Sequence, residues 1–138
     1  NLYHEYPHIS LKPQTWRPLK TSGSKRLIPL VGAAYDAIKI MHRQRVNQFL
    51  FNSYTDENSC NGNSASAALN KWLKLHVPDA VVHSFRHSFR DRLRNAGVQS
   101  EMIDQLGGWS NKTIGQGYGT GFELKILFEQ CRRGLTQT

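Results

Sequence analysis

The sequence predicts a mainly α-helical fold with a small antiparallel β-sheet near the N-terminus, which is an α+β class. The chain has 138 residues, the length of one ordinary domain, and 38% of them are hydrophobic, enough for a modest core. Three prolines, Pro13, Pro18 and Pro29, exclude a helix over residues 7–30. Beyond about residue 33, apolar residues recur at helical spacing, in stretches that end at glycine or proline.

Residues 7–30 are expected to form the sheet. The polar tetrapeptide Thr21-Ser22-Gly23-Ser24 predicts a hairpin turn between strands at residues 16–20 and 25–30. A first strand over about residues 8–12 completes the expected antiparallel arrangement.

The first helix is expected over about residues 33–48, because apolar side chains recur there at Tyr35, Ile38, Met41 and Val46. The apolar run at 49–51 is interpreted as a brief strand, and residues 53–63 as a polar loop.

A second helix is expected over residues 64–76, with Asn63 or Ser64 as its N-cap and Pro78 as its stop. Its inward-facing side chains are expected to be Leu69, Trp72 and Leu73. The later helices are predicted over residues 83–95, 100–106, 111–117 and 122–133, the first of them ended by Gly97.

The charge balance points to a polyanionic partner. Eighteen Lys and Arg against ten Asp and Glu give a net charge of +8, which favours nucleic acid ahead of a membrane surface. No stretch approaches the ~18–20 apolar residues of a membrane span, and the N-terminus does not resemble a secretion signal. Cys60 and Cys131 are too few for a disulfide scaffold or a four-thiolate metal site, so reduced thiols are expected.

The helix that starts at residue 83 carries the strongest local signal. Its basic side chains fall within an arc of about 100°, at His83, Arg86, His87, Arg90 and Arg94. The opposite side is apolar, at Phe85, Phe89, Leu93 and Ala96. Such a stripe is most often a solvated face, but a histidine followed one turn later by an arginine favours a site that binds negative charge.

Two further motifs follow this helix. Leu106-Gly107-Gly108-Trp109-Ser110 places a tryptophan directly after two glycines. Tyr118 lies between Gly117 and Gly119, which contribute no side chains to pack against it, so an exposed tyrosine ring is expected there.

Together these motifs resemble the C-terminal signature of the tyrosine recombinases, or phage-type integrases. That family has a His-x-x-Arg pair, a His or Trp soon after a Leu-Gly step, and a nucleophilic Tyr about nine residues later; Trp109 and Tyr118 are nine positions apart. Residues 19–30 are similar to the family's Lys-Thr-x-x-x-x-Arg-x-x-Pro-Leu hairpin. The resemblance runs from about residue 19 to residue 134 and implies one partial catalytic domain over residues 1–138, with a β part at 7–30 and a helical part at 33–134.

The resemblance implies site-specific DNA recombination through a 3′-phosphotyrosine intermediate, without metal or cofactor. Tyr118 is then the nucleophile, and His83 accepts its proton because a phenol has a pKa of ~10. Lys20 protonates the departing 5′-oxygen, with Lys25 as the competing hairpin lysine.

The phosphate-binding roles fall to the guanidinium and the indole. Arg86 clamps the non-bridging phosphate oxygens, and Trp109 donates its N–H at a position where the family more often has His. The expected contacts to the DNA backbone are Arg90, Lys25 and Arg94.

The resemblance also implies a setting. It is that of a cytoplasmic protein acting at a bacterial nucleoid on double-stranded DNA, to integrate or excise a phage or mobile element. The full-length protein is expected to act as a homo-oligomer, a tetramer. The helix over residues 122–133 has apolar side chains beyond one face, so it either reaches a neighbouring protomer or completes its own core.

One family feature is missing from the first residues. A second catalytic arginine normally precedes the hairpin in a Gly-x-Arg-x-x-Glu stretch, and nothing before Lys20 resembles it. Removal of one preorganised donor typically lowers a rate by ~10²–10³. The chain is therefore expected to begin after that arginine, and the 138-residue polypeptide alone to be inactive or nearly so.

Two other classes stay open. A non-catalytic helix-turn-helix-like DNA-binding module accounts for the basic stripe, but not for the Lys-Thr hairpin or the Trp109–Tyr118 spacing. A metalloprotein could use the i,i+4 pairs His83/His87 or His4/His8, although only Glu5 is placed to complete such a site. Type IB topoisomerases share the chemistry, but the compact spacing here is closer to that of an integrase.

Overall fold

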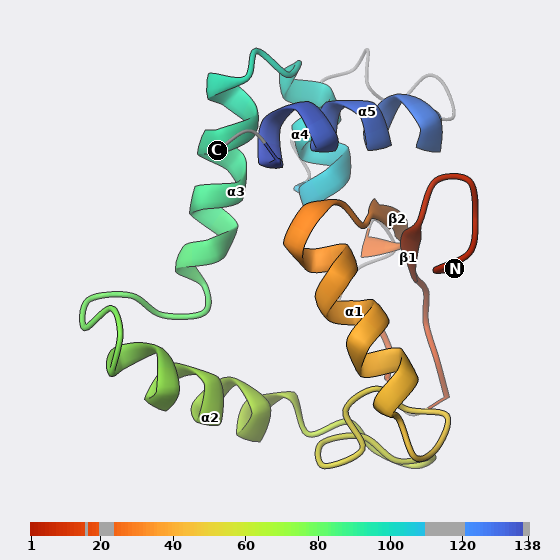
Figure 1. The fold of residues 1–138 in the computed structure, drawn as a ribbon, viewed down its shortest axis with the longest axis vertical. Helices are drawn as coiled ribbons and strands as arrows, with labels where there is room; N and C mark the ends of the chain where they lie inside the picture. Colours follow the sequence, from red (N-terminus) through yellow and green to blue (C-terminus); the bar gives the residue numbers. More distant parts are fainter. Residues whose placement is uncertain (16, 20–23, 110–120, 137–138) are drawn as a thin grey trace.

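Five helices and a two-stranded sheet make up the part of the chain that the computed structural model describes, residues 1–15, 17–19, 24–109 and 121–136 (Figure 1). Their order is β1 (His8–Leu11), β2 (Arg26–Pro29), α1 (Gly32–Gln44), α2 (Gly62–Lys74), α3 (Ser84–Asn95), α4 (Ser100–Gly107) and α5 (Leu124–Leu135). This is the mainly α fold with a small N-terminal antiparallel sheet that the sequence predicts. None of the described helices is long and apolar enough to cross a membrane.

The sheet pairs different strands from those expected. β1 and β2 run antiparallel, with His8 opposite Pro29 and Leu11 opposite Arg26. The strand predicted at 16–20 is not the partner of β2 in the described residues, where Arg17 forms an isolated bridge with Gln14. Proline at position 18 has no N–H to donate to a ladder, which accounts for the short pairing. Residues 21–23 of the predicted turn lie outside the described residues.

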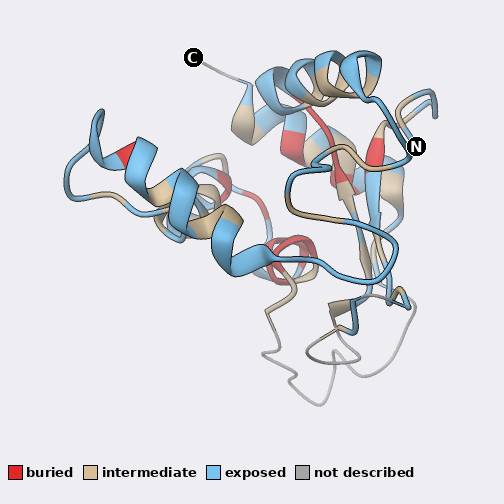
Figure 2. Cartoon of the chain, turned by 90° about the horizontal axis from the view of Figure 1, so that it is seen from below, coloured by how far each residue is buried: buried red, intermediate tan, exposed pale blue. Residues whose placement is uncertain are grey.

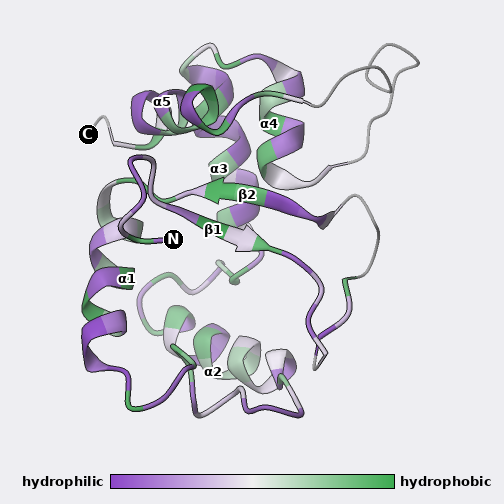
Figure 3. Ribbon diagram, turned by 90° about the vertical axis from the view of Figure 1, so that its right-hand side faces the viewer, coloured by the Kyte–Doolittle hydropathy of each residue, from purple (hydrophilic) through white to green (hydrophobic). Residues whose placement is uncertain are grey.

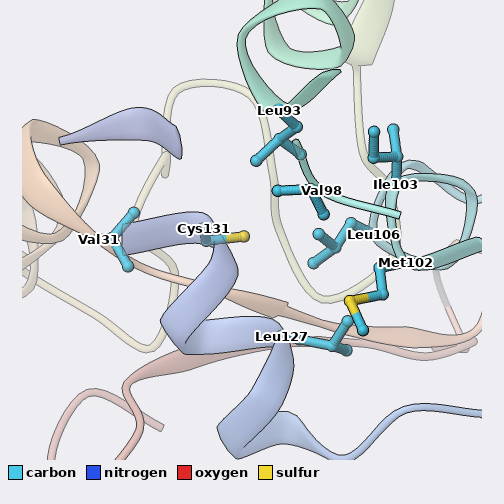
Figure 4. Close-up of a cluster of buried hydrophobic side chains, with 8 residues drawn as sticks. All are labelled: Val31, Leu93, Val98, Met102, Ile103, Leu106, Leu127 and Cys131. Atoms are coloured by element: carbon cyan, nitrogen blue, oxygen red, sulfur yellow. The ribbon is translucent and has the colours of Figure 1, made fainter. Parts of the chain in front are cut away.

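The core lies where α3, α4 and α5 pack together against β2 (Figures 1 and 4). Its least exposed side chains, all at 2% or below, are Leu93, Ile103, Leu106, Leu127 and Cys131. Figure 4 shows them with Val31, Val98 and Met102 as one cluster. Because α5 contributes Leu127 and Cys131, that helix completes the chain's own core, one of the two alternatives for it.

The helices α1 and α2 lie outside this core. Figure 2 shows α1 and α2 exposed or only half-buried along almost their whole length. Of the three α2 side chains predicted to face inward, Leu73 is buried at 6% exposure. The prediction was wrong for Leu69 and Trp72, which are 52% and 58% exposed. An amphipathic pattern predicts which helix face is apolar but not whether another element covers it.

The ends of α1 and α2 differ from the predicted ones. α1 ends at Gln44 instead of residue 48, since the backbone at Arg45 is extended; in the turn that follows, the Asn47 side chain accepts from the Phe49 N–H at 2.9 Å. The run at 49–51 is therefore a turn, not a strand. α2 begins at Gly62, and its N-cap is Asn61, not Asn63 or Ser64; Asn61 Oδ1 accepts from the Ser64 N–H at 3.1 Å.

Glycines end the two helices nearest the candidate site. After α3, Gly97 takes a positive φ of 72°, and α4 ends at Gly108 with a φ of 65°. α3 and α4 consequently match the predicted spans to within one residue. α5 begins at Leu124, two residues later than expected, and the helix predicted at 111–117 lies outside the described residues.

Candidate active site

Two of the sequence motifs meet in space at a cation–aromatic stack. The Arg86 guanidinium carbon of α3 lies 4.1 Å from the centre of the Trp109 ring, just beyond the end of α4. Arg90, one turn further along α3, lies 4.9 Å from the same ring. Residues four apart share a helix face, so α3 presents both guanidinium groups to one indole. The predicted partners Arg86 and Trp109 are thus neighbours, both half-buried.

The two glycines before Trp109 make this stack possible. A Cβ atom added to Gly107 would overlap the six-membered ring of Trp109, so only glycine lets the indole fold back over the end of α4. Gly108 supplies the left-handed turn. The Trp109 backbone N–H then donates to the Asp104 carbonyl at 3.0 Å, which fixes the residue against the helix.

A third arginine, Arg26, joins the cluster from the first position of β2. Its Nε donates to the Leu106 carbonyl at 3.0 Å, and its Nη1 donates to the Ser24 carbonyl at 2.8 Å. Burial lowers the pKa of Arg26, and the positive charge of Arg86 lowers it further. Sequence reasoning assigned Arg26 no role beyond its place in the hairpin motif, and that motif was the only available signal.

Residues 5–121 of the sequence match the model of the phage integrase family. The chain belongs to the phage integrase family. Its members are tyrosine recombinases, so this membership indicates site-specific DNA recombination, with DNA as the partner. No curated protein and no solved structure matched the chain.

In this integrase-family chain, Arg90 has internal partners that the sequence did not reveal. Arg90 Nη2 lies 3.3 Å from Asp104 Oδ1, and Asp104 is buried at 9% exposure. Arg90 Nε is buried and has no hydrogen-bond partner within the described part of the chain. The other two expected DNA contacts are exposed: Lys25, and Arg94, which lies 3.9 Å from Asp91. Contact with DNA stays a prediction for all three.

His83 precedes the first turn of α3, one turn before Arg86, and is exposed. Its ring lies edge-to-face with that of His87, with centroids 5.3 Å apart. Phe85, expected on the packing face, is 63% exposed, whereas Leu93 is fully buried. The first turn of α3 therefore projects beyond the core, and its histidines are open to a ligand.

Tyr118 and Lys20 lie outside the described residues, so their predicted roles stay predictions. Phe122, near the point where the described chain resumes, is bound to α4. The Gln105 amide donates to the Phe122 carbonyl at 3.0 Å and accepts from the Phe122 N–H at 2.8 Å. A side chain at Gly121 would meet this amide at 2.8 Å, and its φ of 80° favours glycine.

The histidines of the metal alternative have different surroundings in the structure. No group of three His, Cys, Asp or Glu side chains that could hold a metal ion occurs within residues 1–15, 17–19, 24–109 and 121–136. His8 is buried, with Nδ1 2.8 Å from the Tyr6 carbonyl and Nε2 2.8 Å from the Asn1 amide. Both its ring nitrogens are therefore engaged in structural hydrogen bonds.

Proposed function

We propose that this chain carries the residues that cleave and rejoin a DNA strand through a 3′-phosphotyrosine at Tyr118, in the integration or excision of a phage or mobile element. The observation that carries the proposal is the stack of Arg86 on Trp109. It joins the His-x-x-Arg helix to the Leu-Gly-Gly-Trp motif, two parts of the family signature that are separate in the sequence. The working form is a homo-oligomer, a tetramer of the full-length protein, acting at the bacterial nucleoid.

The chemistry requires two proton transfers around one phosphate. The Tyr118 oxygen attacks phosphorus and gives its proton to His83, while the bond from phosphorus to the 5′-oxygen breaks and Lys20 protonates that oxygen. The phosphotyrosine ester keeps the energy of the broken bond, so the reverse reaction with a new 5′-hydroxyl rejoins the strand. No metal or cofactor takes part.

Arg86 is suited to stabilise the phosphorane. Its planar guanidinium matches two phosphate oxygens and stays charged throughout the reaction. The Trp109 ring lies under the guanidinium at 4.1 Å, and such a contact contributes roughly 0.5–2 kcal/mol while leaving the N–H groups free to bind phosphate. The Trp109 indole can donate a hydrogen bond to the phosphate but cannot transfer a proton, so Lys20 is left as the proton donor.

The deciding experiment traps the covalent intermediate. The chain is incubated with a pool of nicked duplexes of random sequence in which sulfur replaces the bridging 5′-oxygen, because a thiolate leaves without a proton donor. Guanidinium ion, below denaturing concentration, stands in for the arginine that the residues before Lys20 do not supply. We expect an adduct that maps to Tyr118, is absent in Tyr118→Phe and persists in Tyr3→Phe, a matched exposed tyrosine.

With the ordinary phosphodiester and no guanidinium, we expect little or no adduct, in line with the expected inactivity of the isolated polypeptide. Replacement of Arg86 by Ala lowers adduct formation by about 10²–10³-fold. DNA binding with no adduct on either substrate would contradict the proposal and favour the non-catalytic helix-turn-helix-like module.

A further inference from the structure

Arg26 connects two elements that are far apart in the sequence. It is the first residue of β2, and its Nε donates to the carbonyl of Leu106 in the last turn of α4. Figure 3 shows the start of β2 next to the lower end of α4. The Nη1 of the same side chain also donates to the Ser24 carbonyl, so one guanidinium binds both the segment that precedes β2 and the end of α4.

The end of α4 is a natural place for such a group. The last four carbonyls of a helix have no partner within the helix, and the helix dipole makes that end negative. A guanidinium there satisfies a free carbonyl and carries the favourable charge. Gly108 allows the approach, because an added Cβ would lie 2.5 Å from Arg26 Nη1.

The turn that Arg26 holds is the turn that presents Trp109. Leu106 accepts the Arg26 bond, Gly108 reverses the chain, and Trp109 follows directly, with its ring under Arg86. If the Leu106 carbonyl were released, the backbone bond from Trp109 to Asp104 would remain, but the turn would lose its tie to β2. We expect the Trp109 ring to be less firmly held under Arg86 as a result.

We propose that Arg26 is a positioning residue: by tying β2 to the last turn of α4 it holds Trp109 in the stack with Arg86. The effect of Arg26 on catalysis rests on the proposed function, but its effect on the position of Trp109 does not. Two directed donors are required, so lysine, which keeps the charge on a single flexible amine, is a poor substitute.

The first test follows Trp109 directly and needs no catalysis. In a chain with Trp16→Phe and Trp72→Phe, Trp109 is the only tryptophan. We expect Arg26→Lys and Arg26→Gln to shift its emission to longer wavelength and to raise its quenching by acrylamide. Arg43→Lys, at an exposed arginine in α1, leaves both unchanged. Unchanged Trp109 emission in both Arg26 variants would overturn the proposal.

The second test measures the rate of adduct formation at saturating DNA. Displacement of a catalytic group by about 1 Å can lower a rate by about 10²-fold. We therefore expect Arg26→Lys to lower the rate of adduct formation by about 10–100-fold and to change the DNA affinity little. A normal rate in Arg26→Lys but not in Arg26→Gln would show that only charge matters and would overturn the proposal. So would unfolding of the variants at the assay temperature. If no variant forms an adduct, the proposed function fails while the fluorescence result still decides the role of Arg26.

Discussion

At the scale of single residues, the two cysteines occupy opposite environments. Cys131 lies in the core at 1% exposure, and burial raises the pKa of its thiol to about 12, whereas Cys60 is exposed. At pH 8 a thiol reagent should therefore modify Cys60 quickly and Cys131 only as fast as the chain unfolds. Two reactive thiols of similar rate in the folded chain would contradict this burial.

The same thiol makes stability depend on alkaline pH. An unfolded cysteine has a pKa of ~8.5. Between that pH and about 12, Cys131 therefore keeps its proton in the folded chain and loses it in the unfolded chain. The contribution of Cys131 is complete below pH ~8.5 and is lost as the pH rises toward 12. Urea unfolding at pH 7.5 and pH 10 should show a smaller loss in Cys131→Ala than in the matched variant Cys60→Ala.

How far single residues could be predicted depended on whether a recognisable motif identified them, not on how close their partners lie in the sequence. Arg86 and Trp109 were predicted because motif spacing identifies them, and the structure brings the two together. The partners of Arg26 and Arg90 were not predicted. A hydrogen bond from Arg26 to Leu106 spans 80 positions, and the ion pair from Arg90 to Asp104 depends on how two helices pack.

At the scale of elements, the stability of the molecule should reside in the packing of α3, α4 and α5. Leu93 of α3 is fully buried, so Leu93→Ala should cost about 2–5 kcal/mol in the free energy of unfolding. Trp72 of α2 is 58% exposed, and Trp72→Ala should cost less than ~1 kcal/mol despite the larger deletion. Urea unfolding of the two variants measures both losses in the free energy of unfolding. An equally large cost for Trp72→Ala would mean that the apolar face of α2 is covered in solution.

Elements with a strong local stop were the ones that the sequence predicted well. Gly97 and Gly108 end α3 and α4 because both take a left-handed φ, and the predicted spans agree to within one residue. The errors occurred where several polar residues compete for one role, as with Asn61 at the start of α2. They also occurred where strand pairing was at issue, because the partner of β2 is set by long-range contact and not by the nearby turn.

At the scale of the whole molecule, a net charge of +8 acts together with a few fixed guanidinium groups. Arg26, Arg86 and Arg90 surround one turn of chain, and Asp104 pairs with Arg90. Among the described residues Arg86 has no ion pair, so we expect a phosphate to be attracted to it and not to Arg90. We expect the remaining positive side chains to contribute to affinity through release of counterions from DNA, which makes binding depend on salt.

This division of charge predicts how each basic residue affects the salt dependence. The logarithm of the DNA-binding constant falls linearly with that of the salt concentration, and loss of one phosphate contact reduces the slope by about 1. We expect that reduction in Lys25→Ala and in Arg94→Ala, because both side chains are exposed and the pair of Arg94 with Asp91 lies at the surface at 3.9 Å, where ion pairs are weak. Arg90→Ala should change the slope much less, because Asp104 already pairs with its guanidinium.

The matched control is Arg43→Ala, which removes an exposed arginine from α1, outside the helices that carry the candidate site. Fluorescence anisotropy of a labelled duplex, measured from low to moderate salt, gives each slope. If Arg90→Ala also reduced the slope by about 1, DNA would have to displace Asp104 from Arg90 on binding. Arg90 would then leave its ion pair to bind phosphate, and its buried Nε, which has no partner among the described residues, is the atom that would gain from that movement.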